Sequence, residues 1–322
     1  MSPGAEPIKP NLPGSDDNRV FTLRTVPDTL KIRAYVEQNK PKSAVVIGGG
    51  YIGMEMAENL KHAGLDVTVV EMAEHIIAPL DSDMASLVQH YARENGIRLI
   101  LKNGVQALIP AKSHIEVQLS HGTLNADLVL MSVGVKPETA IAQKAEISCN
   151  SRGAILVDEH MRTSKPDIYA VGDAIAVTNF VTKQETYIPL AGPANKQGRI
   201  AADHICGRNV SFKGTQGTSV LKLFDMTVAT TGIHELQAKQ SNLDYDTIIT
   251  YSPSHATYYP NAKNMMIKTI FEKQSGKILG AQLVGYEGVD KRCDVLATAI
   301  RAGMTAYDLT ELELAYAPPF SS

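Results

Sequence analysis

Tryptophan is absent from this 322-residue sequence, aromatic residues make up only 6% of it, and cysteine occurs three times. The cysteines lie far apart and form neither a C-x-x-C motif nor a zinc-ligand spacing: Cys149, Cys206 and Cys293. This pattern excludes a disulfide framework and a zinc module, and we expect no metal site. An odd number of unpaired cysteines suits a reducing compartment, so we predict a cytoplasmic protein.

Long apolar runs and a strongly unbalanced charge are also missing. No apolar run approaches the roughly 20 residues that a membrane-spanning helix needs, and the N-terminus has no signal-peptide pattern. The net charge is −3, with acidic and basic residues mixed along the chain, so no basic face is offered to nucleic acid. We therefore expect neither a membrane nor a nucleic-acid partner.

One segment carries most of the chemical information. The apolar, β-branched run 44–47 predicts a buried strand, and it leads directly into the G-x-G-x-x-G motif at 48–53. A helix is expected from there to Gly64, followed by a second strand at 67–70. In such a unit the first glycine permits a tight turn, the second lets a pyrophosphate approach the backbone, and the third lets helix and strand pack closely. Because the helix N-terminus then holds the phosphates, we assign to a dinucleotide Gly48, Gly50, Ile52 and Gly53.

An acidic residue ends the second strand and bears on the choice of dinucleotide. Glu71 stands where a carboxylate accepts hydrogen bonds from a ribose 2′-hydroxyl. A 2′-phosphate at this place would be repelled, and the following residues 72–75 contain no arginine to offset the repulsion. His75 is mostly neutral at pH 7. The sequence therefore favours NADH over NADPH.

Further strands and a helix complete this half of the chain. A helix start at 80–83 leads into an amphipathic face made of Met84, Leu87, Val88 and Tyr91, and Gly96 ends the helix. Strands are expected at 97–101, 105–109, 115–119 and 127–133, with a turn at 121–122. The pattern predicts a doubly wound, Rossmann-like α/β domain with a small antiparallel insertion.

A different pattern follows. A polar turn at 161–167 leads to a short predicted strand at 168–171 and then to Gly172 and Asp173. After residues 188–193, a helix is expected from about Ala194 to Cys206. An aspartate that ends a buried strand beside a helix N-terminus can bind a polyol chain, with the helix facing an anionic ring edge. The alternative is an ordinary loop carboxylate.

The chain resembles the pyridine nucleotide-disulfide oxidoreductase superfamily in the order of its motifs: GGGYIGME (48–55), VGVKP (133–137), IYAVGD (168–173) and PLAGPANKQGR (189–199). Within it, the chain is most similar to the group of coenzyme A-disulfide reductases, NADH oxidases and NADH peroxidases. The resemblance implies FAD as a second cofactor, with Asp173 on its ribityl chain. It assigns further cofactor contacts to Gly134, Gly172, Pro189, Leu190 and Ala191, and it places Asn195 at the substrate.

The resemblance also assigns roles to two residues of the first helix. Tyr51 matches the residue that gates the nicotinamide site over the flavin, and Glu55 matches an acid close to the nicotinamide. The two are four residues apart and share a helix face, so packing and a solvated charge are the alternative reading.

The third region, 216–322, matches the interface domain through which such enzymes form homodimers. Strands are expected at 219–224, 227–231, 247–251, 265–271 and 278–285, with a helix at 289–302 that points Leu296 and Ile300 inward. The predicted organisation is thus a remnant of an FAD-binding domain and linker (1–38), an NAD(H)-binding domain (39–135), the C-terminal part of the FAD-binding domain (136–215) and an α+β dimerisation domain (216–322).

Two tyrosines bear on the substrate. Tyr258 and Tyr316 match positions where coenzyme A-disulfide reductases place tyrosines from the partner subunit over the active cysteine. A phenolic hydroxyl there can donate to a developing thiolate, and we therefore predict a catalytic role for both. The alternative is that Tyr258 and its neighbour Tyr259 are half-buried interface aromatics.

The family's own glycine-rich FAD unit and redox cysteine are not found in the sequence, which has a single G-x-G-x-x-G motif. We therefore expect an internal fragment of a longer flavoprotein, and we interpret the three cysteines as buried or incidental thiols. Two hypotheses remain open. One is an NADH- and FAD-dependent oxidoreductase acting on a small-molecule disulfide or a peroxide, and the other is a redox-incompetent fragment that binds NADH and dimerises.

Overall fold

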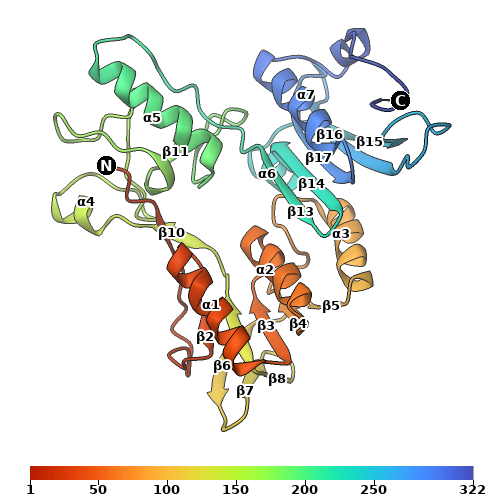
Figure 1. The fold of residues 1–322 in the computed structure, drawn as a ribbon. Coiled ribbons are helices and arrows are strands. Elements are labelled where there is room, and N and C mark those ends of the chain that lie inside the picture. The colour runs from red at the N-terminus through yellow and green to blue at the C-terminus, as the bar shows by residue number, and fades with distance from the viewer. Residues whose placement is uncertain (322) are drawn as a thin grey trace. The chain divides into compact units, whose positions relative to one another are not determined.

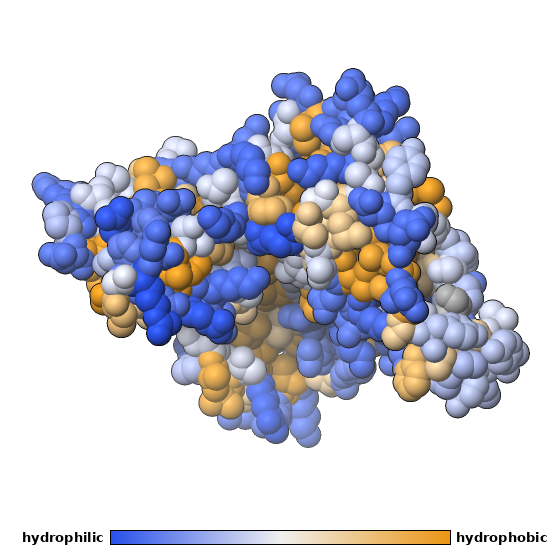
Figure 2. Space-filling view, turned by 90° about the horizontal axis from the view of Figure 1, so that it is seen from above, coloured by the Kyte–Doolittle hydropathy of each residue, from blue (hydrophilic) through white to orange (hydrophobic). Residues whose placement is uncertain are grey.

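The computed structural model describes residues 1–321, which form two compact units (Figure 1). The first unit comprises residues 7–134 and 221–228, and the second comprises residues 1–6, 135–220 and 229–322. Within the described residues, no helix is long and apolar enough to cross a membrane. Figure 2 shows hydrophobic side chains in small groups between hydrophilic ones on the face that it draws.

The first unit is built on a parallel five-stranded sheet with the strand order β2-β9-β3-β4-β5. Its strands are β2 (Val20–Phe21), β9 (Leu128–Met131), β3 (Ser43–Ile47), β4 (Asp66–Val70) and β5 (Ile97–Ile100). Val46 of the central strand pairs with Val69 on one side and Leu130 on the other, and all three are fully buried. Continuous apolar runs are typical of parallel strands that are covered on both faces.

Three helices and a small antiparallel sheet complete this unit. The helices are α1 (Val26–Asn39), α2 (Tyr51–His62) and α3 (Ser82–Glu94). The predicted insertion is confirmed as the sheet β6-β7-β8, made of β6 (Val105–Pro110), β7 (Ile115–Leu119) and β8 (Thr123–Ala126). The observed strand β9 is shorter than the strand expected at 127–133. It begins after Asp127, whose carboxylate accepts hydrogen bonds from the N–H groups of Lys42 and Ser43.

The second unit begins with short elements around the predicted flavin region. They are β1 (Ala5–Pro7), β10 (Val135–Pro137), α4 (Ala140–Lys144), the 3₁₀ turn η1 (Gly172–Ala174), β11 (Val177–Thr178), β12 (Glu185–Thr186) and α5 (Ala191–Ile205). The predicted strand at 168–171 is wrong. Only Tyr169 makes a bridge, to Arg162, because Met161 and Asp167 both have positive φ angles and end the pairing.

The start of α5 also corrects the prediction. We expected the helix from Ala194, but it begins at Ala191, so that Pro193 lies in its first turn. A proline is tolerated there because the first N–H groups of a helix have no partner within the helix. The helix ends at Ile205 and leaves Cys206 exposed.

A further five-stranded sheet has the order β13-β14-β17-β16-β15, and its residues other than 221–228 belong to the second unit. The strands are β13 (Ser219–Leu223), β14 (Met226–Gly232), β15 (Tyr245–Pro253), β16 (Asn264–Glu272) and β17 (Ile278–Gly285). The helix α6 (Glu235–Gln240) lies between β14 and β15, and the helix α7 (Val289–Ala302) and the 3₁₀ turn η2 (Asp308–Glu311) follow β17. β16 pairs antiparallel with both β15 and β17. As predicted, α7 buries Leu296 and Ile300.

One charged side chain lies inside this sheet. Lys268 of β16 is 1% exposed, and its ammonium donates to the Glu235 carboxylate at 2.5 Å. The same carboxylate accepts a hydrogen bond from the Tyr245 hydroxyl at 2.8 Å. The buried cation is thus paired, as a charge removed from water must be.

Candidate functional site

The glycine motif joins β3 to α2 in the first unit, and each of its glycines has a different environment. Gly48 has φ 104°, and a Cβ on it would lie 2.4 Å from the carbonyl oxygen of Ser132. A Cβ on Gly53 would lie 2.0 Å from the carbonyl oxygen of Gly48 and 2.7 Å from Ser132 Oγ. Gly50, the N-cap of α2, has nothing within 4 Å of a Cβ, and no side chain caps the helix start. Two glycines are therefore required by packing, whereas Gly50 faces open space.

Glu71 lies directly beside this loop. Its Oε2 accepts a hydrogen bond from the Gly49 N–H at 2.7 Å, and its Oε1 accepts one from the Ala73 N–H at 2.8 Å. These bonds fix the carboxylate at the end of β4 and leave each oxygen a further lone pair. The sequence places Glu71 correctly at the strand end, but it gives no sign of the bond to the glycine loop.

The first turns of α2 carry the other predicted residues of this unit. Tyr51 is half-buried at the first helical position, and Ile52 and Glu55 are exposed on the surface. Ile52, Glu55 and Glu58 line a cavity of about 470 Å³. Burial, and secondarily the charge of Glu58, raise the pKa of the Glu55 carboxyl. Gly134, with φ 111°, is exposed, and its carbonyl oxygen accepts a hydrogen bond from the Ile8 N–H.

The second unit brings the predicted flavin residues together. Gly172 and Asp173 form η1, and a Cβ on Gly172 would lie 3.8 Å from the Cβ of Ala194 in α5. The Gly172 N–H donates to Oε1 of Gln197, which is 1% exposed. Partial burial raises the pKa of the Asp173 carboxyl, and burial followed by the charge of Asp173 raises the pKa of Tyr187 to about 12.

The start of α5 adjoins this turn. Pro189 and Leu190 precede the helix, and Leu190 is its extended N-cap with no side-chain cap. Ala191 is the first helical residue, and Asn195 is exposed one turn later. An uncapped start of a 15-residue helix offers N–H groups and a positive dipole end to an anionic group.

The two predicted catalytic tyrosines are also brought together. Tyr258, on the loop between β15 and β16, lies with its hydroxyl 3.4 Å from that of Tyr316 near the C-terminus. Both side chains are exposed, by 76% and 63%. The hydrogen bond between them raises the pKa of Tyr258. The Ala256 N–H, which contacts the carbonyl oxygens of Pro318 and Ser321, holds the two loops side by side.

Cys149 and Cys293 lack the exposed setting that activates a thiol. Burial, and then the charges of Asp294 and Asp290, raise the pKa of Cys293 to about 12. Burial also raises the pKa of the half-buried Cys149. Within residues 1–321, no group of three or more His, Cys, Asp or Glu side chains could hold a metal ion.

Sequence reasoning missed two residues that fix the backbone of these sites. The Ser132 hydroxyl donates to the carbonyl oxygens of Ile47 and Gly48, which share its one proton. This contact stabilises the turn at the glycine motif. Gln197 holds the Gly172 N–H, as described above. Gln197 lies within the PLAGPANKQGR motif, which was the available signal, whereas nothing in the sequence around Ser132 distinguishes its hydroxyl from that of any other serine.

Comparisons with known proteins agree on one family. Residues 1–198 match "Pyridine nucleotide-disulphide oxidoreductase", and residues 218–322 match its dimerisation domain. The chain is 38% identical to an NADH oxidase of Methanocaldococcus jannaschii and 34% identical to a coenzyme A disulfide reductase of Staphylococcus haemolyticus, in each case over 100% of this chain and 71% of the relative.

A solved structure gives the same answer. The reduced CoADR-RHD of Bacillus anthracis is 50% identical, with a TM-score of 0.97, and the match covers 100% of this chain and 58% of that protein. The chain therefore spans less than two thirds of the length of that relative. The family uses NADH and FAD as cofactors. On these matches, the chain belongs to the pyridine nucleotide-disulphide oxidoreductase family.

Proposed function

We propose that this chain binds NADH and contacts FAD in a homodimeric oxidoreductase that passes electrons to a small-molecule disulfide, of which coenzyme A disulfide is the best candidate. The single observation that carries the substrate class is the pair of exposed tyrosine hydroxyls of Tyr258 and Tyr316, 3.4 Å apart. We also propose a cytoplasmic location, since the three cysteines are unpaired.

The first unit fits a dinucleotide. The open space over Gly50 admits a diphosphate to the start of α2, and the fixed carboxylate of Glu71 retains lone pairs for ribose hydroxyls. We assign Tyr51 to covering the nicotinamide pocket and Glu55 to its wall. The Glu55 carboxylate can accept a hydrogen bond from the amide N–H of a nicotinamide.

The second unit fits part of a flavin. Asp173 can accept hydrogen bonds from a polyol chain, and the uncapped start of α5 can face an electron-rich ring edge. When bound beside Asp173 and the start of α5, FAD would supply hydride-accepting, two-electron redox chemistry. The chain's own residues position the groups, and the Gly172–Gln197 bond keeps the turn that carries Asp173 in place.

The tyrosine pair suits a thiolate product. Each hydroxyl can donate a hydrogen bond, and a donor beside developing negative charge stabilises it more strongly than it stabilises the neutral disulfide. One of the two hydroxyls bonds to the other, which leaves the second free to donate outward. The alternative is that the electron acceptor is oxygen or a peroxide. The similarity to a relative named NADH oxidase supports this alternative.

A second function, NADH binding and dimerisation without turnover, is favoured by one observation. The sequence has one G-x-G-x-x-G motif, and Asp173 with α5 can reach only the ribityl and ring portions of FAD. The absorbance spectrum of the purified chain with added FAD separates the two functions. A bound flavin band that NADH bleaches supports the oxidoreductase, and its absence supports the second function.

The substrate class is tested by coenzyme A disulfide-dependent NADH oxidation in the presence of FAD, with the family's FAD-binding and redox-cysteine segment added because we expect negligible disulfide reduction by the chain alone. Tyr258→Phe and Tyr316→Phe should each lower disulfide reduction about tenfold to a hundredfold, because a hydrogen bond to a charged group contributes about 1.5–3 kcal/mol. Both should leave reduction of ferricyanide by NADH unchanged. Tyr307→Phe, at another exposed tyrosine of this unit, is the matched control. Equal rates of disulfide reduction in all three variants would contradict a catalytic role for Tyr258 and Tyr316.

A further inference from the structure

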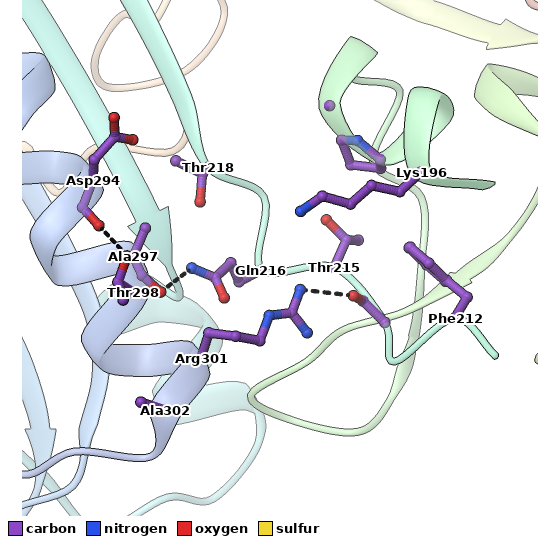
Figure 3. A pocket seen from close by; sticks show the side chains of 13 residues that line it. Lys196, Phe212, Thr215, Gln216, Thr218, Asp294, Ala297, Thr298, Arg301 and Ala302 are labelled. Atoms are coloured by element: carbon purple, nitrogen blue, oxygen red, sulfur yellow. Dashed lines mark hydrogen bonds between the residues drawn. The ribbon is translucent and has the colours of Figure 1, made fainter. Parts of the chain in front are cut away.

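A cavity of about 660 Å³ in the second unit lies apart from the residues assigned above (Figure 3). The first turns of α5 and the chain segment 212–218 form one side of it, and α7 forms the other. Its volume is within the range of small-molecule sites, roughly 300–1,000 Å³. Its lining includes Lys196, Gln216, Asp294 and Arg301.

Two cations reach this cavity from different helices. Figure 3 shows the Lys196 side chain extending from α5 and the Arg301 side chain extending from α7. Arg301 is held in place, because its Nη2 donates to the Gly214 carbonyl oxygen at 3.1 Å and its guanidinium lies 4.0 Å from the centre of the Phe180 ring. The Lys196 ammonium makes no hydrogen bond and no ion pair within residues 1–321, so it is available to a ligand.

A polar acceptor in the wall has no partner. Gln216 is 7% exposed, and its Nε2 donates to Thr231 Oγ1 at 3.0 Å and to the Ala297 carbonyl oxygen at 2.9 Å. These bonds fix the orientation of the amide, since a carbonyl oxygen can only accept. Among the described residues, Gln216 Oε1 is the buried side-chain polar atom without a hydrogen bond. A buried acceptor of this kind calls for a donor, because leaving it without a hydrogen bond is destabilising.

The remaining polar groups define the ligand further. The Thr218 hydroxyl bonds to Thr231 Oγ1 at 2.8 Å, and the Thr298 hydroxyl donates to the Asp294 carbonyl oxygen at 2.8 Å. Asp294 contributes the carboxylate of the lining and opposes an anion placed near it. A carboxylate ligand presents two oxygens on one edge, whereas a phosphate presents oxygens in several directions and can meet cations from both walls.

We propose that this cavity binds a small phosphorylated polyol, with its phosphate between Lys196 and Arg301 and a hydroxyl group toward Gln216. The two cations supply charge-assisted hydrogen bonds, and a ligand hydroxyl can donate to the amide oxygen. This site needs neither NADH nor a flavin, so it is independent of the proposed function.

Ribose 5-phosphate is the probe, and calorimetric titration is the measurement. The chain carries Gly50→Val in every arm, so that the glycine loop does not bind the phosphate. Lys196→Met should weaken binding about tenfold, and Asp294→Asn should strengthen it because a repulsive charge is removed. Arg199→Met, which removes an exposed cation from the same helix outside the cavity, is the matched control.

The signs of these changes decide the outcome. Opposite effects of Lys196→Met and Asp294→Asn, an unchanged Arg199→Met and weaker binding of unphosphorylated ribose support the site. Equal weakening by Lys196→Met and Arg199→Met would mean general attraction to a basic helix and would overturn it. No saturable heat with ribose 5-phosphate in the parent chain would overturn it as well.

Discussion

Gly50→Val should abolish dinucleotide binding while leaving the fold intact, and the structure gives the reason. Gly50 has φ −75°, which any residue adopts, and a Cβ there meets nothing within 4 Å. The cost to stability is therefore within about 1 kcal/mol, the range of unfavourable N-cap residues. The valine methyl groups occupy the space through which a diphosphate would approach the backbone.

The loss of affinity follows from the hydrogen bonds that a displaced diphosphate forfeits. Each bond between a backbone N–H and a charged phosphate contributes about 1.5–3 kcal/mol, so losing two of them should weaken NADH binding at least about a hundredfold. Calorimetry with NADH gives the affinity, and thermal unfolding gives the stability of the same preparation.

A neighbouring glycine provides the contrast. A Cβ on Gly53 would lie 2.0 Å from the Gly48 carbonyl oxygen, so Gly53→Ala should shift the backbone and cost about 1–3 kcal/mol of folding free energy. We expect Gly50→Val to lose binding at an unchanged Tm and Gly53→Ala to lower Tm by several degrees. Wild-type NADH affinity in Gly50→Val would refute the placement of the diphosphate.

Two further predictions concern charged side chains. Replacing Glu71 by Ala together with Met72→Arg should shift affinity toward NADPH by about 1–2 kcal/mol, read from the ratio of the two dissociation constants, and an unchanged ratio would mean that the acid is not at the ribose. Lys268→Met should lower the free energy of unfolding by about 2–3 kcal/mol. This loss is smaller than for a fully buried ion pair because the Glu235 side chain is 28% exposed. Burial raises the pKa of Glu235, but hydrogen bonds from Lys268 and Tyr245 outweigh it and lower the pKa below its ordinary value. The stabilisation from the Lys268–Glu235 pair is present at neutral pH and is lost as the pH falls through the lowered pKa of Glu235. The Tm difference between wild type and Lys268→Met should therefore shrink in acid. A constant Tm difference from pH 7 to 3 would contradict the pairing.

The parallel sheet and the glycine loop could be predicted from the sequence because local pattern and tertiary burial agree there. The run at 44–47 is buried on both faces of the sheet, and close backbone contacts require the glycines at positions 48 and 53. The five-stranded sheet of the second unit was also predicted, with β17 and α7 at their observed bounds.

Other elements could not be predicted from apolar periodicity. α1 was missed because Ile32 is its single buried residue. Its signal was a capping box, in which the Asp28 carboxylate accepts bonds from the Thr25 N–H and hydroxyl. The start of α5 was predicted too late in the chain because we placed Pro193 in the loop before the helix. Pro193 in fact lies in the first turn of α5.

The site was predicted unevenly. Glu71, which we propose to bind a ribose, stands at the end of β4, where a sequence pattern points to it. Asp173, which we propose to bind a flavin, lies in the 3₁₀ turn η1 and not at the end of a strand. Gln197 and Ser132 act by holding the backbone of another segment, and that depends on contacts across the fold. The approach of Tyr258 to Tyr316 came from family resemblance, because no local pattern links two loops so far apart in the chain.

Calorimetric titration of NADH and NADPH into the unmodified chain is the most direct test of the proposed dinucleotide site. We expect saturable binding of one NADH per chain at the glycine loop, with NADPH weaker because Glu71 repels the 2′-phosphate. Absence of saturable NADH binding, or equal affinity for the two dinucleotides, would contradict it.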